Sequence, residues 1–289
     1  MDQDLFSLIG KSKELVKLPL LPKNIHILMK ALADENLSYP KLAEVILNYP
    51  DISARLIHLS NSAWSSPVAP ITEIELACSR LGTSIVKSLC IALSVSSHFN
   101  PARCPEFNTE RYWTTSLLVA EGAGLLAAKI KSNTALAEQK NSAQTAGILH
   151  NIGLLWLAEN LPNETTYALR TVLSEPALTV REAFHQRTSV DHCIVGGWIG
   201  KQWNFPDFLI AAIRYHFDLS YQEQYWEMAL IVGSAAAMVA NIYKNEEAPL
   251  SARMELHLGV SPEAQRLIFQ TLHNNLEKTK GLVRILFNY

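Results

Sequence analysis

The spacing of apolar residues predicts helices along almost the whole chain. Between Leu42 and Tyr49 the apolar side chains recur at intervals of three and four, and the same rhythm resumes after Pro50 and runs to Leu59. Residues 84–98 are apolar at most positions, which is typical of a helix buried on most sides. The alternation that predicts strands is scarce. We therefore predict an all-α fold.

Proline and glycine residues divide this pattern into separate helices. Pro22, Pro40 and Pro50 stand where helices would begin, a position that proline tolerates. Gly82 ends a helix that starts near Glu75. We expect further helices over residues 84–98, 109–131, 142–159, 178–187, 191–203, 206–217, 221–243 and 261–287. Loops that contain Pro162 and Pro176, and a polar break over 244–249, are expected between them.

A segment with two prolines, 100–108, is the best candidate for a boundary within the chain. We predict two closely packed lobes. The N-terminal helical lobe would span residues 1–100 and a helical core residues 108–220. A C-terminal helical continuation would then cover residues 221–289. No internal repeat or low-complexity tract is evident.

Composition narrows the class of protein. Hydrophobic residues make up 48% of the 289 residues and charged residues 18%, which favours a sizeable core over disorder. The net charge of −2 and the pI of about 6.5 give no indication of nucleic-acid binding. The acidic N-terminus is unlike a secretory signal, and the longest apolar stretch, Met228–Ile242, is shorter than the ~20 residues of a membrane helix. We expect a cytoplasmic protein that does not bind membranes.

The four cysteines are far apart in the sequence, at positions 78, 90, 104 and 193. This spacing does not match the closely spaced cysteine pairs of a disulfide framework or a structural zinc motif. We expect free thiols in the core. Cys193 follows His192, but neighbours in a helix point about 100° apart, so their adjacency alone predicts no thiol nucleophile.

Three of the nine histidines stand in settings that suggest shared chemistry. His150 lies in an otherwise apolar helix, and His216 ends a helix. His192 follows Asp191 at a helix start. If these helices converge, neutral imidazoles and a carboxylate could bind a metal that activates water. A histidine on an apolar helix is more often a core residue bonded to a backbone carbonyl, and no phosphate loop, nucleophile elbow or zinc-protease motif is present.

The order of segments is similar to that of the HDOD family of bacterial signalling proteins, a branch of the HD phosphohydrolases regarded as lacking the catalytic residues. The resemblance runs from about Leu18 to Phe217. It rests on the segments LPLLP at 18–22, LAEVI at 42–46, DISARLIHLSNS at 51–62 and IELACSRLG at 74–82. The resemblance implies the family's multi-helix fold.

The second half is similar to a degenerate HD core. The resemblance places Thr115 where a metal-binding histidine is expected, and the His-Asp doublet reads His150–Asn151. The stretch 231–237, where the last aspartate is expected, contains no carboxylate. The resemblance therefore implies no catalytic residue, no cofactor and no metal. It also implies a vestigial pocket formed by six residues: Thr115, His150, Asn151, Asp191, His192 and His216.

Three functions stay open at this point. The leading one is a non-catalytic regulatory or scaffold protein of signal transduction that acts through other signalling proteins. The first alternative is a residual metal-dependent phosphohydrolase of a nucleotide or cyclic dinucleotide, with Arg214 or Lys87 holding phosphate. The second is a sensor that binds a small molecule in the vestigial pocket without turnover, between apolar walls such as Trp113 and Trp156.

Overall fold

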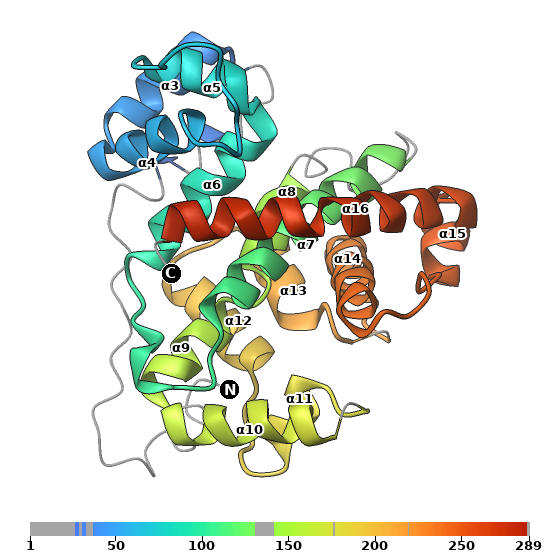
Figure 1. The fold of residues 1–289 in the computed structure, drawn as a ribbon. Coiled ribbons are helices and arrows are strands. Elements are labelled where there is room, and N and C mark those ends of the chain that lie inside the picture. The colour runs from blue at the N-terminus through green and yellow to red at the C-terminus, as the bar shows by residue number, and fades with distance from the viewer. Residues whose placement is uncertain are drawn as a thin grey trace.

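The computed structural model describes residues 27–28, 31–32, 37–130, 142–175, 177–218 and 220–287. These residues form helices joined by turns and loops, and no strand occurs among them. The predicted all-α class is confirmed (Figure 1). The helix start expected at Pro22 and the segment 18–22 lie outside the described residues.

The first part of the fold is a small group of helices at the top of Figure 1. Its members are α3 (Tyr39–Leu47), α4 (Pro50–Ser60), α5 (Ile74–Leu81) and α6 (Thr83–Ser96). Proline stands in the first turn of α3 and of α4, where its missing N–H costs no hydrogen bond. The apolar faces of these helices enclose a core that includes Leu42, Leu56 and Leu89, all fully buried. Helices α5 and α6 meet at Gly82 with a bend of 111°.

The larger part of the fold is built around α7 (Thr109–Lys129), which follows a short 3₁₀ turn, η1 (Pro101–Arg103). Three helices pack along α7: α8 (Ala143–Leu149), α14 (Trp226–Lys244) and α16 (Pro262–Phe287). The remaining elements are α9 (Ile152–Asn160), α10 (Pro162–Ser174), α11 (Val180–His185), α12 (His192–Gln202), α13 (Asp207–Tyr215) and α15 (Ala252–Leu258). The division at 100–108 that the sequence predicts stays a prediction.

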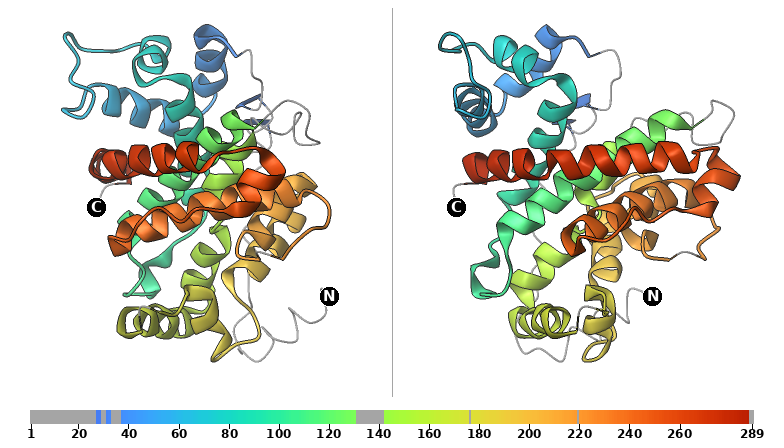
Figure 2. Two further views of the ribbon diagram at one scale, coloured as in Figure 1. Left: turned by 90° about the vertical axis from the view of Figure 1, so that its right-hand side faces the viewer. Right: turned by 45° about the vertical axis from the view of Figure 1, so that its right-hand side comes forward.

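Helix α16 connects the two parts. In each view it crosses the molecule beneath α3, α4 and α5, with α14 on its other side (Figures 1 and 2). The indole N–H of Trp64, in the loop after α4, donates to the carbonyl of Lys278 over 2.8 Å, and the guanidinium of Arg55 donates to the carbonyl of Leu286. Near the end of α16, Phe287 stacks on Trp113 of α7 with ring centroids 4.8 Å apart. The C-terminal helix thus joins α4 to the core.

The structure corrects three of the expected elements. Residues 142–159 form two helices, because the chain turns at His150 and Asn151 between α8 and α9. Helix α10 replaces the loop expected around Pro162, which occupies its first turn. The third is the short helix α15, which lies beyond the polar break and was not expected.

Helix α14 contains the apolar stretch noted in the sequence. Among the described helices, α14 has the length and apolar composition of a membrane-spanning helix. Helices α5 and α6 together would also meet these two criteria if they were taken as one bent span. Half of the apolar window in α14 is buried inside the protein, including Met228, Ile231 and Met238. This burial supports the interpretation of α14 as a core helix.

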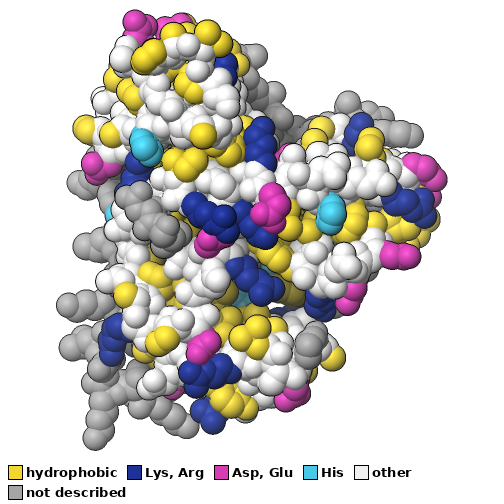
Figure 3. Space-filling view, in the orientation of Figure 1, with side chains coloured by type: hydrophobic (Ala, Val, Ile, Leu, Met, Phe, Trp, Pro, Cys, Tyr) yellow, Lys and Arg dark blue, Asp and Glu magenta, His cyan; other side chains and the backbone are white. Residues whose placement is uncertain are grey.

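The face shown in Figure 3 carries charges of both signs close together over α16 and α7. Arg284 donates to both carboxylate oxygens of Glu110, at 2.9 and 2.8 Å, and Lys280 lies 2.7 Å from Glu277. Within each pair the opposite charges compensate each other, and further Lys and Arg side chains lie nearby on this face (Figure 3).

Candidate functional site

Three buried histidines meet where helices begin and end. His150 directly follows α8, His192 is the first residue of α12, and His216 directly follows α13. The ring centroids of His150 and His216 are 5.2 Å apart, and those of His192 and His216 are 6.0 Å apart. Each residue is only 1–3% exposed. We call these three residues the histidine cluster.

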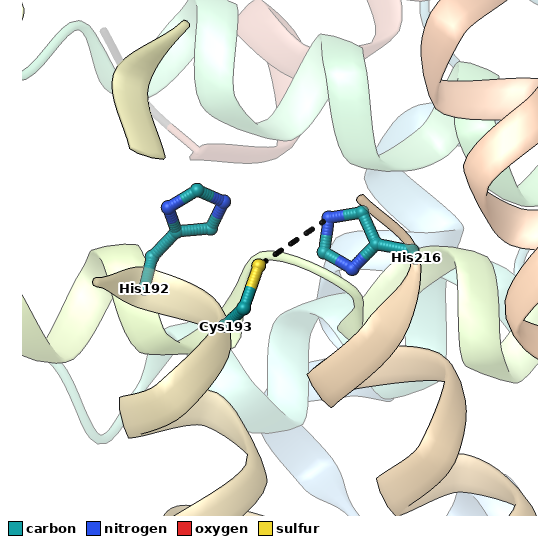
Figure 4. A group of neighbouring side chains, drawn as sticks. All are labelled: His192, Cys193 and His216. Atoms are coloured by element: carbon teal, nitrogen blue, oxygen red, sulfur yellow. Dashed lines mark hydrogen bonds between the residues drawn. The ribbon is translucent and has the colours of Figure 1, made fainter. Parts of the chain in front are cut away.

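Cys193 lies beside the histidine cluster, although its position in the sequence predicted no role for it. Its Sγ lies 4.0 Å from Nε2 of His216 (Figure 4). Ligand atoms of His192, Cys193 and His216 all lie within 4.8 Å of one another. Adjacent residues of α12 can both reach this place because the end of α13 lies against the first turn of α12. All four cysteines are buried and unpaired, which confirms the prediction of free thiols.

Hydrogen bonds fix the orientation of two of the rings. Nδ1 of His150 lies 2.6 Å from the carbonyl oxygen of Gly147, and Nδ1 of His216 lies 3.2 and 3.1 Å from those of Ala212 and Ile213. A carbonyl can only accept, so each Nδ1 carries the hydrogen and each Nε2 keeps a free lone pair. By contrast, Nδ1 of His192 is buried without a hydrogen-bond partner.

The cluster is uncharged at neutral pH. Burial lowers the pKa of His150 and of His192 to about 4 and that of His216 well below its ordinary value. Burial, followed by the nearby carboxylate of Asp191, raises the pKa of the Cys193 thiol. Three neutral imidazoles and a protonated thiol therefore face one another, and the thiol is a poor nucleophile in this state.

Asp191 adjoins the cluster, but both of its carboxylate oxygens are already engaged. Oδ1 caps α12 by accepting from the backbone N–H groups of Cys193 and Ile194, at 2.8 and 2.9 Å. Oδ2 accepts from Nε of Arg181 at 2.9 Å and from Nε2 of His185 at 2.8 Å. The sequence placed Asp191 in the pocket as a potential ligand. In the structure it holds the start of α12 in place.

The charge of Asp191 is secured by these contacts. Burial alone would raise its pKa, but the N–H of Ile194, His192 and the guanidinium of Arg181 outweigh burial and lower the pKa below the ordinary value. Arg181 and His185 both come from α11, and their side chains are 39% and 40% exposed. Helix α11 thus connects the buried carboxylate to the surface.

Helix α11 has a capping box that predicts a measurable effect. Oγ1 of Thr179 accepts from the N–H of Glu182 at 3.2 Å, while the Glu182 carboxylate accepts from the N–H of Thr179 at 2.8 Å. We expect Thr179→Ala to lower the free energy of unfolding by about 1 kcal/mol. Ser38→Ala is the matched control, since Ser38 precedes α3 without a side-chain cap bond, and urea titration compares the two. Equal losses in both variants would contradict the capping role of Thr179.

The other two predicted pocket residues, Asn151 and Thr115, lie in α9's N-cap position and in α7. Asn151 precedes α9, and its Oδ1 is buried without a hydrogen-bond partner. Thr115 lies in α7 beside the phenol of Tyr243, on α14. Ten residues before Tyr243 on the same helix, Gly233 packs against the backbone of His216. A helix rises 1.5 Å per residue, so Thr115 and His216 contact α14 at points about 15 Å apart along that helix.

Helix α7 runs beside the cluster. Gly124 of α7 packs against Gln144, and Ala120 packs against Gly147, one turn before His150, so α7 and α8 are antiparallel. His150 therefore lies opposite a position in α7 within about one turn of Thr115. The structure brings His150, His192 and His216 together, and the place of Thr115 in the pocket stays a prediction.

The arrangement lacks what a pair of hard divalent cations needs. Within the described ranges, the group of His, Cys, Asp and Glu side chains placed to hold an ion is His192, Cys193 and His216, which includes no carboxylate. Magnesium and manganese prefer carboxylate, carbonyl and water oxygens. Asp191 is held by Arg181 and His185, and Asn151 carries no charge. The cluster therefore does not fit the two-metal centre of an HD hydrolase.

Comparison with known proteins places the chain in a family. The sequence profile described as the HDOD domain matches residues 18–219. Among curated proteins, none matches this sequence.

Solved structures share the fold. A protein from Marinobacter aquaeolei VT8, provisionally named a signal transduction protein, aligns with a TM-score of 0.85 and 20% identity. That alignment covers 99% of this chain, which spans 66% of the Marinobacter protein. An HDOD domain protein of unknown function from Geobacter sulfurreducens aligns over 100% of both chains, with a TM-score of 0.73 and 22% identity.

A third structure, from Shewanella amazonensis SB2B, is provisionally named a phosphohydrolase. It aligns over 98% of this chain and 97% of its own length, with a TM-score of 0.68 and 21% identity. At identities of 20–22%, these likenesses establish the fold alone.

Proposed function

Because the chain belongs to the HDOD domain family, we propose that it is a non-catalytic regulatory protein of bacterial signal transduction that acts in the cytoplasm by binding other signalling proteins. One observation carries this proposal: the histidine cluster is closed to solvent, and among the described residues the group placed to hold an ion contains no carboxylate. A hydrolase of the HD type needs both an open position for substrate and charged ligands for its metals. A closed cluster of this composition therefore supports a non-catalytic role.

The phosphohydrolase alternative is less well supported by the geometry. Its one-metal form would use His150, Asp191, His192 and His216. The carboxylate of Asp191 accepts four hydrogen bonds from other groups, so metal binding would have to break the contacts with Arg181 or with the start of α12. The Shewanella relative's provisional name speaks for this alternative, but a likeness of 21% identity bears on the fold only.

The ligand-sensor alternative is supported by only one of its two predicted walls. Trp156 is fully buried and packs edge to face on Trp198, with centroids 5.7 Å apart, which favours core packing. Trp113 stacks on Phe287 and also lines a cavity of about 370 Å³ with Phe99 and Leu155.

A turnover assay tests the non-catalytic part of the proposal. We expect the purified full chain with Mn²⁺ to hydrolyse bis-p-nitrophenyl phosphate no faster than Mn²⁺ alone, because no free carboxylate is placed to activate water. His150→Ala is the matched variant and should give the same background rate. Turnover by the wild type that His150→Ala abolishes would overturn this part and revive the hydrolase alternative.

Capture of binding partners tests the proposal that the protein acts by binding other signalling proteins. The full chain, cross-linked in its own cells, should recover the same signalling protein in independent repeats. That protein, once purified, should bind the full chain directly in calorimetry. Repeats that share no protein, or a shared protein that fails to bind when purified, would contradict the proposed mode of action.

A further inference from the structure

The buried donors around His216 are arranged as a ligand set for one soft metal ion. Sγ of Cys193 and Nε2 of His216 are 4.0 Å apart, and a ligand atom of His192 lies within 4.8 Å of both. In a tetrahedral zinc site, bond lengths of 2.0–2.3 Å separate neighbouring ligand atoms by about 3.6 Å. Shifts of about 1 Å or less, within the range of side-chain rotation, would close the site. In Figure 4 the three side chains point toward a common space.

The hydrogen bonds of the cluster prepare it for a metal. Because Nδ1 of His216 is bonded to the carbonyls of Ala212 and Ile213, its Nε2 lone pair faces Cys193. A backbone carbonyl on the other ring nitrogen is the usual support of a metal-binding histidine. His150, supported in the same way by Gly147, lies edge-on to His216 and is a further neutral imidazole beside the group.

Unpartnered polar atoms in and beside the cluster also lower the stability of the metal-free fold. Burying an imidazole nitrogen without a partner costs about 1–3 kcal/mol, and Nδ1 of His192 is such an atom. The Oδ1 atom of Asn151, between α8 and α9, is a second one. Unsatisfied buried groups of this kind call for a bound water or ion. A group of one thiol and two imidazoles matches a thiophilic cation in both softness and number of donors.

We infer that His192, Cys193 and His216 bind a single thiophilic transition-metal ion such as Zn²⁺, which locks the first turn of α12 to the end of α13. This site is distinct from the two-metal centre of a hydrolase: it holds one ion, uses a thiolate and leaves Asp191 in its cap. The proposed regulatory function does not depend on it. Its role would be to fasten the start of α12 to the end of α13, two helices that also pack against each other at Gly196 and Ile213.

Metal binding must displace the thiol proton. Zn²⁺ takes the place of that proton on Sγ, so one proton is released for each ion bound. Because protons compete with zinc for the thiolate and the imidazoles, zinc retention should weaken as the pH falls from 8 to 6. Proton release measured in weakly buffered solution gives a readout that does not involve any enzyme activity.

Metal analysis of the purified full chain tests the inference. After dialysis against Zn²⁺ and removal of the excess, we expect about one equivalent of zinc in the wild type and less than about 0.2 in Cys193→Ala and in His216→Ala, since three donors are the minimum for a stable site. Cys104→Ala is the control, because Cys104 is equally buried but lies beside Thr166, away from the cluster. It should retain about one equivalent.

Two further measurements separate ligation from misfolding. Co²⁺ in place of zinc should give a thiolate-to-metal absorption band in the wild type and in Cys104→Ala, and none in Cys193→Ala. Zinc should raise the melting temperature of the wild type and leave that of Cys193→Ala unchanged. Zinc below about 0.1 equivalents in the wild type, or equal retention in Cys193→Ala and the control, would overturn the inference. Neither result would affect partner binding, so the proposed function is tested separately.

Discussion

Gly153→Ala should lower the free energy of unfolding by about 3 kcal/mol or more, the upper part of the range for overpacking a core. Gly153 lies in the first turn of α9, where this helix crosses the start of α12. A Cβ atom at this position would overlap the carbonyl oxygen of His192 and come within 2.6 Å of the backbone nitrogen of Gly196. Both neighbours are backbone atoms, so no side-chain rotation can relieve the clash, and α12 would have to move away.

Gly281→Ala provides the matched control for this prediction. Gly281 lies within α16, and the nearest heavy atom to an added Cβ is Cδ1 of Trp64 at 3.7 Å, an ordinary contact. Alanine favours a helix over glycine by about 0.8–1.0 kcal/mol, so this variant should be as stable as the wild type or more stable. Urea unfolding of both variants measures the difference. A Gly153→Ala protein as stable as the wild type would mean that α9 and α12 do not pack as closely as described.

Most helices could be predicted because local signals mark their ends. Proline in the first turns of α3 and α4 and glycine after α5 gave bounds close to those observed. The break between α8 and α9 has no such signal. Residues 146–158 are almost continuously apolar, and the chain turns there because α9 must cross α12 at Gly153. The need for this turn comes from α12, which begins about forty residues later in the sequence, so local residues do not reveal it.

Helix α10 was missed for a different reason. Pro162 indicated a break, which is correct, but the same proline also begins the next helix. Its apolar residues Ala168, Leu169 and Val172 recur at helical spacing and pack against the core. The apolar pattern for this helix was therefore present, and the proline with the polar residues after it led to the wrong prediction of a loop.

The candidate site could be predicted only in part. The histidines were found because each stands at a helix end or on an apolar helix, and the resemblance grouped them. A shared role for Cys193 and His192 was not predicted, because neighbouring residues of one helix point about 100° apart. That argument does not consider what a second helix can bring to both side chains. The thiol reaches the cluster because His216 approaches from α13. The role of Asp191 as a cap bound to Arg181 and His185 likewise depends on α11, whose position the sequence does not reveal.

Acidification should destabilise the metal-free protein strongly between pH 6.5 and 5. The pKa values of His150 and His192 are about 4 in the folded state, against about 6.5 in the unfolded chain. Because the folded pKa values are lowered, the stability that depends on them is complete above pH 6.5 and is lost as the pH falls toward 4. The two rings together should remove about 3 kcal/mol between pH 6.5 and 5, and His216 adds to this loss.

The carboxylate beside the cluster does not mask this effect, because the lowered pKa of Asp191 keeps it ionised in this window. Urea titrations in the presence of a chelator measure the free energy of unfolding at each pH. His150→Leu should reduce the slope by about 1 kcal/mol per pH unit, the average contribution of one ring over this window, while His58→Gln, at an exposed position of α4, should leave it unchanged. If wild type and His150→Leu lose stability in parallel over this range, the imidazole of His150 is not buried in its neutral form, and the cluster cannot be the closed, uncharged site described above.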